Sequence, residues 1–464
     1  MAQLGRIVRP VVDADTCQSC RVCLRACPAE LLPELRAEAD TVRGAVYRGT
    51  ALEGTPPADL PPCQAACPIG QRVPAYVGQL ARGQWREALF TIRRENPLPA
   101  VCGTLCNHAC QTACLRGSLD AAVAIRELKR LAARYERSHA DEVRAWLRDR
   151  RASANGKRVA VVGSGPAGLT AAHDLALAGC AVTVFEGGDE AGGMLRHAIP
   201  GFRLPRDVLD HELSMLAALD IRIETGRWVR QAEELERLVV THDAVLLALG
   251  APRGTQLELP GWDGADCLDA LEFLRRTNRG EAPALSGTVL VVGGGNVALD
   301  AARAALRCGA DQVQVVYRRE REQMPVDPFE LREAEDEGIS FCFRALPRAV
   351  ERDGVRAAAL VCRRTVLGSP DPSGRPSVVV SDETVRIPGQ WVIAAIGQAA
   401  EHTCVGGQAV QTDGRLRVDD NGAVPGRPGL FGAGDGITGP SYVVEAMASG
   451  RRAARGMLDY MEVE

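Results

Sequence analysis

Residues 157–168 read Lys157-Arg-Val-Ala-Val-Val-Gly163-Ser-Gly165-Pro-Ala-Gly168, an apolar run that leads directly into a glycine-rich turn. The run is typical of a buried parallel strand, and the residues after the turn have the pattern of a helix. At such a junction the first glycine permits a tight turn, the second lets backbone amides approach a pyrophosphate, and the third lets helix and strand pack closely. Glu186 ends the next strand, where a carboxylate can accept hydrogen bonds from a ribose diol. The stretch therefore predicts a dinucleotide site that includes Gly163, Gly165, Gly168 and Glu186.

A second strand–turn–helix–strand unit begins at Thr288 and contains the turn Gly293-Gly-Gly295-Asn-Val-Ala298. Two such units predict two dinucleotide-binding domains. The second strand of this unit ends in Tyr317-Arg318-Arg319, with no acid at the ribose position. A guanidinium pair there suits a ribose 2′-phosphate and favours NADP, although two arginines also fit a solvated loop and leave NAD open. The expected contacts of this second site are Gly293, Gly295, Ala298, Arg318 and Arg319.

Near the C-terminus, Leu430-Phe-Gly-Ala-Gly434-Asp435 follows a strand, and residues 439–450 open a final helix. In these residues the sequence resembles the flavoproteins that have two dinucleotide-binding domains. The resemblance implies FAD in the first site, with Gly434 and Asp435 at its ribityl and diphosphate portion, and chain crossings near 247–250 and 394–397. The six cysteines after residue 114 contain no CxxC pair, so the chemistry of a flavin disulfide reductase is not expected.

Cysteines are concentrated in the first quarter of the chain, where ten of the 16 lie at or before Cys114. In a reducing compartment such a cluster binds metal more often than it forms disulfides. The run Cys17-x2-Cys20-x2-Cys23-x3-Cys27-Pro has the spacing of the bacterial ferredoxin motif, which binds a [4Fe-4S] cluster and directs its fourth cysteine to another cluster. A zinc knuckle is the alternative interpretation, and the second run of a complete ferredoxin is missing.

A second group of cysteines comprises Cys63, Cys67, Cys102, Cys106, Cys110 and Cys114, in a helical context. This group resembles the cluster domain of the glutamate synthase small subunit. It is also similar to the flavoprotein part of dihydropyrimidine dehydrogenase and to the bifurcating NADH-dependent ferredoxin:NADP oxidoreductase. The resemblance extends to the C-terminus, and it implies that Gly193 and Arg196 lie beside the flavin ring.

The pattern also departs from that family. No further CxxC precedes Cys63, and six cysteines are fewer than the eight ligands of two cubanes. In the family the cysteine matching Cys102 is often not a ligand, and a Gln or Glu often completes one cluster at the position of Lys129, which leaves Glu127 as a candidate. We expect at least two [4Fe-4S] clusters, and three if the N-terminal run completes its own. The expected ligands are Cys17, Cys20, Cys23, Cys27, Cys63, Cys67, Cys106, Cys110 and Cys114.

Length and composition agree with an α/β protein of several domains, since 464 residues correspond to about three domains of about 150 residues. A net charge of −4 argues against nucleic-acid binding. No apolar run reaches the roughly 18 residues of a membrane helix, so we expect no membrane insertion and a cytoplasmic location. The predicted parts are a ferredoxin-like module (1–45), a linker (46–62), a helical iron-sulfur domain (63–151), a Rossmann-like FAD domain (157–265 and 389–464) and a Rossmann-like NAD(P)-binding domain (266–388).

Together these parts predict an electron-transfer enzyme. NAD(P)H gives two electrons as a hydride whereas a cubane passes one at a time, so a flavin must stand between them. This transfer needs no acid–base pair, and we name no catalytic residue. Because no part of the chain looks like a substrate-activating domain, we expect a partner subunit or a ferredoxin to handle the final substrate, as in a 2-oxoacid or formate oxidoreductase. A glutamate synthase small subunit and a non-enzymatic iron-sulfur scaffold or redox sensor are the alternatives.

Overall fold

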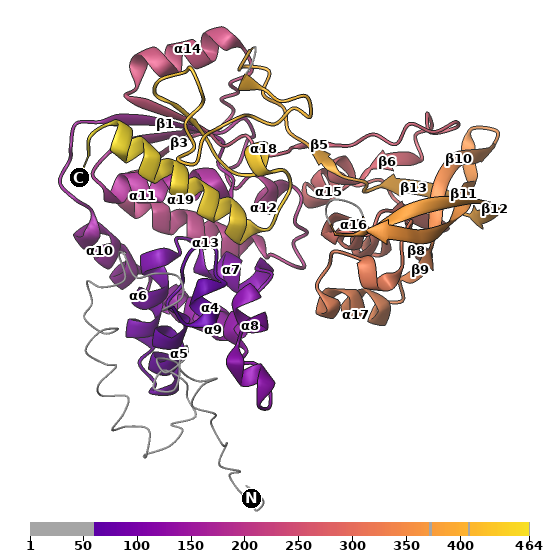
Figure 1. The fold of residues 1–464 in the computed structure, drawn as a ribbon, viewed down its shortest axis with the longest axis horizontal. Helices are drawn as coiled ribbons and strands as arrows, with labels where there is room; N and C mark the ends of the chain where they lie inside the picture. Colours follow the sequence, from indigo (N-terminus) through magenta and orange to yellow (C-terminus); the bar gives the residue numbers. More distant parts are fainter. Residues whose placement is uncertain (1–59, 371–373, 407–408, 464) are drawn as a thin grey trace, which may run out of the picture.

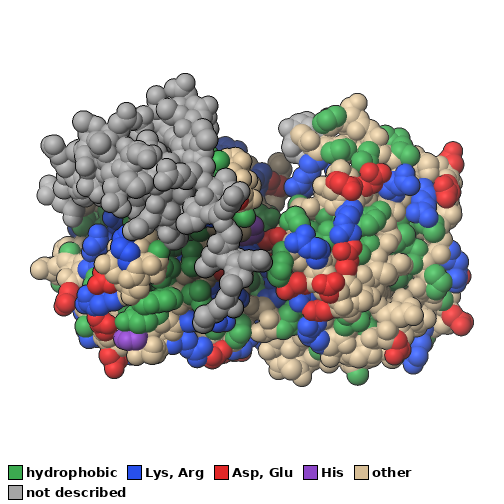
Figure 2. Space-filling view, turned by 90° about the horizontal axis from the view of Figure 1, so that it is seen from below, with side chains coloured by type: hydrophobic (Ala, Val, Ile, Leu, Met, Phe, Trp, Pro, Cys, Tyr) green, Lys and Arg blue, Asp and Glu red, His purple; other side chains and the backbone are tan. Residues whose placement is uncertain are grey.

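The computed structural model describes residues 60–370, 374–406 and 409–463 (Figure 1). The predicted ferredoxin-like module, with Cys17, Cys20, Cys23 and Cys27, lies outside the described residues, as does most of the predicted linker. None of the described helices is both long and apolar enough to cross a membrane. On the face that Figure 2 shows, acidic and basic side chains are interspersed over the coloured residues.

The described chain begins with helices only. They are α4 (Pro62–Ala65), α5 (Val73–Ala81), α6 (Trp85–Glu95), α7 (Pro99–Leu105), α8 (Ala109–Thr112), the 3-10 turn η3 (Leu115–Ser118), α9 (Ile125–Ser138) and α10 (Ala140–Arg150). Proline stands in the first turn of α4, α5 and α7, where its missing N–H costs no helical hydrogen bond. Apolar side chains of α5, α6 and α9 form a core that includes Cys63 and Cys110.

The first dinucleotide unit is a five-stranded parallel sheet in the order β15-β4-β1-β2-β3. Its elements are β1 (Arg158–Val162), α11 (Pro166–Leu177), β2 (Ala181–Phe185), α12 (Met194–His197), α13 (Arg206–Leu216), η4 (Ala217–Leu219), β3 (Arg222–Glu224), α14 (Ala232–Thr241), β4 (Ala244–Leu247), β15 (Leu430–Gly432), α18 (Asp435–Thr438) and α19 (Val443–Tyr460). Helices α11 and α19 pack so closely that a Cβ at Gly450 would lie 2.1 Å from the carbonyl oxygen of Ala167.

The second unit is another parallel sheet, in the order β6-β13-β7-β8-β9. Its elements are β6 (Cys267–Asp269), α15 (Ala270–Asn278), β7 (Thr288–Val292), α16 (Asn296–Arg307), β8 (Gln312–Tyr317), η5 (Arg321–Gln323), α17 (Pro328–Asp336), β9 (Ser340–Phe343) and β13 (Trp391–Ala394). A three-stranded antiparallel sheet, β10 (Ala345–Asp353), β11 (Arg356–Pro370) and β12 (Pro376–Pro388), extends from it (Figure 1). The two parallel sheets confirm the predicted fold class.

The chain passes between the two sheets twice. The short strands β5 (Arg253–Gly254) and β14 (Gln398–Ala399) pair antiparallel where the two crossings run side by side. The second crossing lies after β13, so the predicted boundary at residue 389 falls a few residues too early. The physical reason is that Trp391–Ala394 pairs with β7 before the chain returns to the first sheet.

The cysteine-bearing helices and the first sheet share one apolar core, in which Leu98, Val101 and Leu105 pack with residues such as Val161 and Leu169. A buried ion cluster joins the same two parts. The Arg93 guanidinium pairs with Glu136 of α9 and, at 2.8 Å, with Glu212 of α13, and His211 reaches Glu136 at 3.0 Å. Burial raises the pKa of Glu212 to about 7, since one guanidinium serves two carboxylates.

We expect Arg93→Met to lower the free energy of unfolding by about 3–5 kcal/mol, because it leaves two carboxylates buried without their cation. Urea unfolding followed by intrinsic fluorescence measures this change. Arg137→Met is the matched control, since Arg137 also joins α9 to α13 through Asp207, at 2.8 Å, but both side chains are about half exposed. The control should lose no more than about 1 kcal/mol. Equal losses in the two variants would contradict this role for Arg93.

Candidate cofactor and cluster sites

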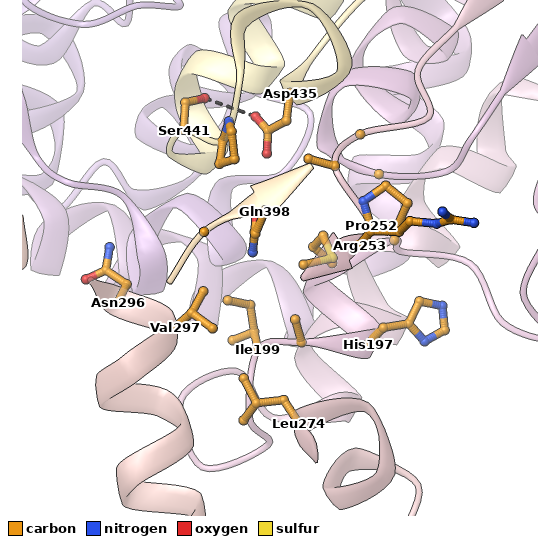
Figure 3. Close-up of a pocket in the computed structure, with 18 of the residues that line it drawn as sticks. His197, Ile199, Pro252, Arg253, Leu274, Asn296, Val297, Gln398, Asp435 and Ser441 are labelled. Atoms are coloured by element: carbon orange, nitrogen blue, oxygen red, sulfur yellow. Dashed lines mark hydrogen bonds between the residues drawn. The ribbon is translucent and has the colours of Figure 1, made fainter. Parts of the chain in front are cut away.

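A cavity of about 1420 Å³ lies where the two sheets meet, and both glycine-rich turns line it (Figure 3). One small ligand typically fills about 300–1,000 Å³, so this space suits more than one. Asp435 and Ser441 face it from the first unit, and Asn296 and Val297 face it from the start of α16. Open parallel sheets bind their ligands at this edge, beyond the carboxyl ends of the strands.

The first turn has the geometry that its three glycines predict. Gly163 has φ +105°, and a Cβ there would lie 2.3 Å from the carbonyl oxygen of Ala248. A Cβ at Gly168 would lie 2.0 Å from the oxygen of Gly163, so this residue packs helix against strand and does not line the cavity. Gly165 has φ −71°, and a Cβ there would meet no atom within 4 Å. The open space above Gly165 fits a diphosphate close to the backbone.

Glu186 lies on the cavity wall at the end of β2 and is 9% exposed. Its carboxylate accepts hydrogen bonds from the backbone N–H of Ser164 at 3.0 Å and of Gly188 at 2.7 Å. The Trp228 ring packs against Gly187 so closely that a Cβ on Gly187 would lie 2.5 Å from the ring atoms. Ser164 and Trp228 were not predicted as part of this site. Ser164 stands inside the motif, but the approach of Trp228 depends on β3 pairing with β2, which no local pattern encodes.

Asp435 begins α18 and lines the cavity. Burial raises the pKa of its carboxyl group to about 6, although the Ser441 hydroxyl, which donates to it at 3.1 Å, opposes the shift. Gly434 has φ +75°, and its N–H donates to Ser449 of α19 at 3.0 Å. The start of α19 at Val443 also lines the cavity, so its free N–H groups are available to an electron-rich ligand.

Gly193 and Arg196, which were expected together, lie in different surroundings. Gly193 lines the cavity with φ +53°, and a Cβ there would lie 2.8 Å from the Cα of Gly165. Arg196 does not line the cavity. Its guanidinium donates to the Ala191 carbonyl at 3.2 Å and pairs with Asp210. Arg196 thus holds the loop that carries Gly193, and its contact with the cofactor stays a prediction.

The second turn repeats the geometry of the first. Gly293 has φ +147°, and a Cβ there would lie 2.3 Å from the Ala395 oxygen, whereas Gly295 has open space. Ala298 is fully buried and does not line the cavity, which fits its packing role. Gly294 was missed: a Cβ there would lie 2.4 Å from the Tyr317 ring.

The two arginines after β8 differ in how far their side chains are buried. Both line the cavity, but Arg319 is 7% exposed and its Nε donates to the Pro376 carbonyl of β12 at 2.8 Å. Arg318 is exposed. Arg318 is therefore the better placed of the two to turn toward a ligand phosphate, while Arg319 also holds the antiparallel sheet in position.

Five of the six described cysteines of the helical part, all but Cys114, face one or both of two polar side chains, Tyr76 and Lys129. Cys63, Cys102, Cys106 and Cys110 are buried, and Cys67 and Cys114 are half-buried, all as free thiols. Tyr76 is fully buried among them, and its hydroxyl has no hydrogen-bond partner in the described part of the chain. Lys129 is 3% exposed and faces the same thiols.

This donor set fits cysteine-ligated iron-sulfur clusters. Thiolates and sulfides would accept the hydrogen bond that Tyr76 leaves free and would balance the charge of Lys129. Burial raises the pKa of the Cys110 thiol to about 12, so a bound cation is needed for thiolates here. In residues 60–463, apart from the short gaps, no three His, Cys, Asp or Glu side chains converge on one metal ion. A cubane differs in this respect, because each thiolate binds a different iron.

Glu127, the candidate ligand on α9, does not point to the cysteines. Its carboxylate is about half exposed and pairs with Arg126 and Arg130. Lys129 occupies the buried face of the helix instead.

The cysteine group lies next to the cavity wall. Leu105 lines the cavity, and Cys106 is the next residue. The Cys102 Sγ lies 3.4 Å from the Sδ of Met447 on α19, and Asn107 donates to Glu445 of the same helix at 3.1 Å. The helix that borders the first dinucleotide site is thus also the helix on which the cysteine loop rests.

The comparisons with known proteins agree with this arrangement. The model of the pyridine nucleotide-disulphide oxidoreductase family matches residues 157–450. The chain belongs to this family. A second model, described as dihydropyrimidine dehydrogenase domain II with a 4Fe-4S cluster, matches residues 58–141. The protein is therefore an NAD(P)-dependent flavin and iron-sulfur oxidoreductase, which confirms the predicted FAD, nicotinamide and [4Fe-4S] cofactors. The ligands of the individual sites stay predictions.

Curated relatives include the NADP(+)-dependent formate dehydrogenase subunit beta of Moorella thermoacetica, which is 38% identical over 86% of this chain and 60% of that protein. The glutamate synthase [NADPH] small chain of Escherichia coli K12 is 31% identical over 87% of this chain and 89% of its own length. The chain spans about 38–60% of the first three relatives it matches. FprA of Mycobacterium tuberculosis has the same fold, with TM-score 0.59 and 21% identity over 66% of this chain and 84% of FprA.

We expect Gly165→Val to abolish stoichiometric flavin binding, because its side chain enters open space that the diphosphate needs while the extended backbone tolerates it. Absorbance of the purified protein measures the flavin content. Gly295→Val is the matched control, since its backbone is also extended and its Cβ is also unhindered. The control should retain flavin and bind NAD(P)H weakly. Full flavin absorbance in the Gly165 variant would refute the assignment of FAD to the first site.

Proposed function

We propose that this chain is the electron-transfer subunit of a larger oxidoreductase, in which FAD exchanges electrons between NAD(P)H and [4Fe-4S] clusters. The observation that carries the proposal is the single cavity with two dinucleotide turns and a wall residue, Leu105, adjacent to Cys106. A nicotinamide from one side and a cysteine-bound cluster from the other can both come close to one flavin.

In this proposal the groups of the chain itself bind and orient the cofactors. In the proposed complex, Gly163 and Gly165 bring backbone amides to the FAD diphosphate, and Glu186 binds its ribose. Bound flavin supplies the ability to take two electrons as a hydride and to release them singly. Asp435 and the first turn of α19 face the same end of the cavity, where the helix N-terminus favours electron density on the ligand. No described side chain has to act as an acid or base for this transfer.

A partner protein is part of the proposal. Relatives named as beta subunits, those of formate dehydrogenase and of the NADPH-Fe(3+) oxidoreductase of Geobacter sulfurreducens, are longer than this chain. We propose a cytoplasmic complex in which the N-terminal cysteine run passes electrons to a catalytic subunit, such as a formate or 2-oxoacid oxidoreductase, or to a ferredoxin. The physiological direction of transfer follows from that partner.

A glutamate synthase small subunit is the second candidate, because this chain covers 89% of the Escherichia coli small chain. Purification from the native host separates the two candidates. Glutamine-dependent synthesis of glutamate by the purified complex would favour the second candidate, and formate- or 2-oxoacid-dependent reduction of NAD(P) would favour the first.

The cluster assignment has its own test. We expect Cys106→Ser to lower the iron and acid-labile sulfide of anaerobically purified protein by about one cluster, with the FAD content unchanged. The loss should also weaken the low-temperature paramagnetic signal that NAD(P)H produces. Cys308→Ser is the matched control, because that half-buried thiol lies in the second unit and contacts Thr277. Zinc as the dominant metal, or equal iron in the two variants, would contradict the proposal.

The coenzyme preference is proposed as NADP and rests on Arg318. One charge-assisted hydrogen bond to a 2′-phosphate contributes on the order of 1.5–3 kcal/mol, so Arg318→Ala should reduce kcat/KM for NADPH by about tenfold or more. Efficiency with NADH should change little. Arg319→Ala should instead lower stability, since it removes the bond to Pro376. Steady-state kinetics with both coenzymes measures the effect, and a wild-type preference for NADH would contradict it.

A further inference from the structure

Lys129 is chemically unusual in this chain. Only two of the 55 basic residues are lysines, Lys129 and Lys157, and the other 53 are arginines. Lys157 is partly exposed at the start of the first sheet, whereas Lys129 is 3% exposed. A buried ammonium group is costly unless negative charge or hydrogen-bond acceptors surround it. Its surroundings therefore indicate what it does.

The packing of α9 on α7 determines where Lys129 points. A Cβ on Gly103 of α7 would lie 2.8 Å from the Cα of Arg130, so the two helices touch through their backbones. The Arg126 guanidinium donates to the Cys106 carbonyl at 3.2 Å. Helix α9 buries its face with Ile125, Lys129 and Ala132, at helical spacing. This geometry directs Lys129 into the cysteine group.

The neighbours of Lys129 are thiols. Ile125 and Ala132, which flank Lys129 on the buried face of α9, pack in the same core as Cys63 and Cys110, and the Lys129 amine faces Cys102, Cys106, Cys67 and Cys110. The carboxylate nearest in sequence on this helix, Glu127, pairs with Arg126 and Arg130 instead. An ammonium group has three donors and no lone pair, so it cannot bind iron. What it can supply is a fixed positive charge and N–H donors to sulfur.

We propose that Lys129 sets the reduction potential of the cluster held by the surrounding cysteines, through its charge and without acting as a ligand. The inference rests on the proposed function, since it requires a cluster at these cysteines. One-electron reduction adds one negative charge to the cluster and breaks no bond. A nearby buried cation stabilises that reduced form, because Coulomb interactions are strong where water is excluded. Lys129 thereby makes the cluster a better acceptor of the flavin's electrons.

The experiment uses the full-length protein and three variants. Lys129→Met removes the charge at similar size, Lys129→Arg keeps the charge, and Lys157→Met is the control at the chain's other lysine. Iron, sulfide and flavin contents are measured first. Anaerobic redox titration followed by low-temperature EPR then gives the potential of each cluster, and the signal that Cys106→Ser loses identifies the cluster concerned.

We expect Lys129→Met to shift the one-electron equilibrium of that cluster toward the oxidised form at least tenfold, a fall of about 59 mV. Lys129→Arg should shift it less, and Lys157→Met should leave it unchanged. Loss of the cluster in the Met variant with retention in the Arg variant would also support a charge requirement. An unchanged potential in Lys129→Met would overturn the proposal. Loss of iron from both Lys129 variants with flavin retained would overturn it too, since it would indicate an amine ligand. Wild-type protein without iron would instead refute the cluster site.

Discussion

The buried contact of Arg93 with Glu136 and Glu212 is the constraint on which the proposed electron path depends. It fixes α6 and α9, from the cysteine-bearing part, against α13 of the first dinucleotide unit. Electron transfer needs a short and constant distance between the donor and the acceptor. This ion cluster is buried between the cysteine-bearing helices and the first dinucleotide unit, so it holds them at a fixed distance. The surrounding apolar core is continuous across the two parts, since Leu98 and Val101 pack with the residues of the first sheet. The cysteine-bearing helices and the first dinucleotide unit therefore share one core and should move together as a rigid body.

The two glycine-rich turns have the same backbone geometry. Gly163 and Gly293 both have positive φ and both lie against a carbonyl oxygen of the strand that crosses to the other domain. The turns differ most in charge at the strand ends, where Glu186 follows β2 and Arg318 follows β8. In the proposed function the backbone provides the diphosphate contact in each case, and the residue after the second strand selects the ribose.

Local patterns predicted the two sheets and the glycine turns, because those features depend on short stretches of backbone. They could not predict features that depend on distant partners. The family resemblance implies a flavin contact for Arg196, but no local pattern predicts that its guanidinium pairs with Asp210. Arg318 and Arg319 look equivalent in sequence, but the Arg319 side chain is buried and bonds to Pro376 of β12. The orientation of Lys129 toward the thiols depends on Gly103, which lies 26 residues earlier on another helix. The N-terminal cysteine run lies outside the described residues and stays a prediction.

The second parallel-sheet unit, for which we propose nicotinamide binding, is joined to the other parts in a different way. Its apolar core is its own, and its contacts with the neighbouring parts include charged pairs: Arg203 with Asp300 at 2.8 Å, and His108 with Asp327 at 2.8 Å. Burial raises the pKa of Asp300 to about 6, so this pair carries a desolvation cost that an apolar joint avoids. Interfaces of this polar kind permit relative motion of domains more readily than a shared core does. The division suits the proposed chemistry, because a coenzyme must enter and leave on every turnover, whereas the clusters and the flavin must keep their distance.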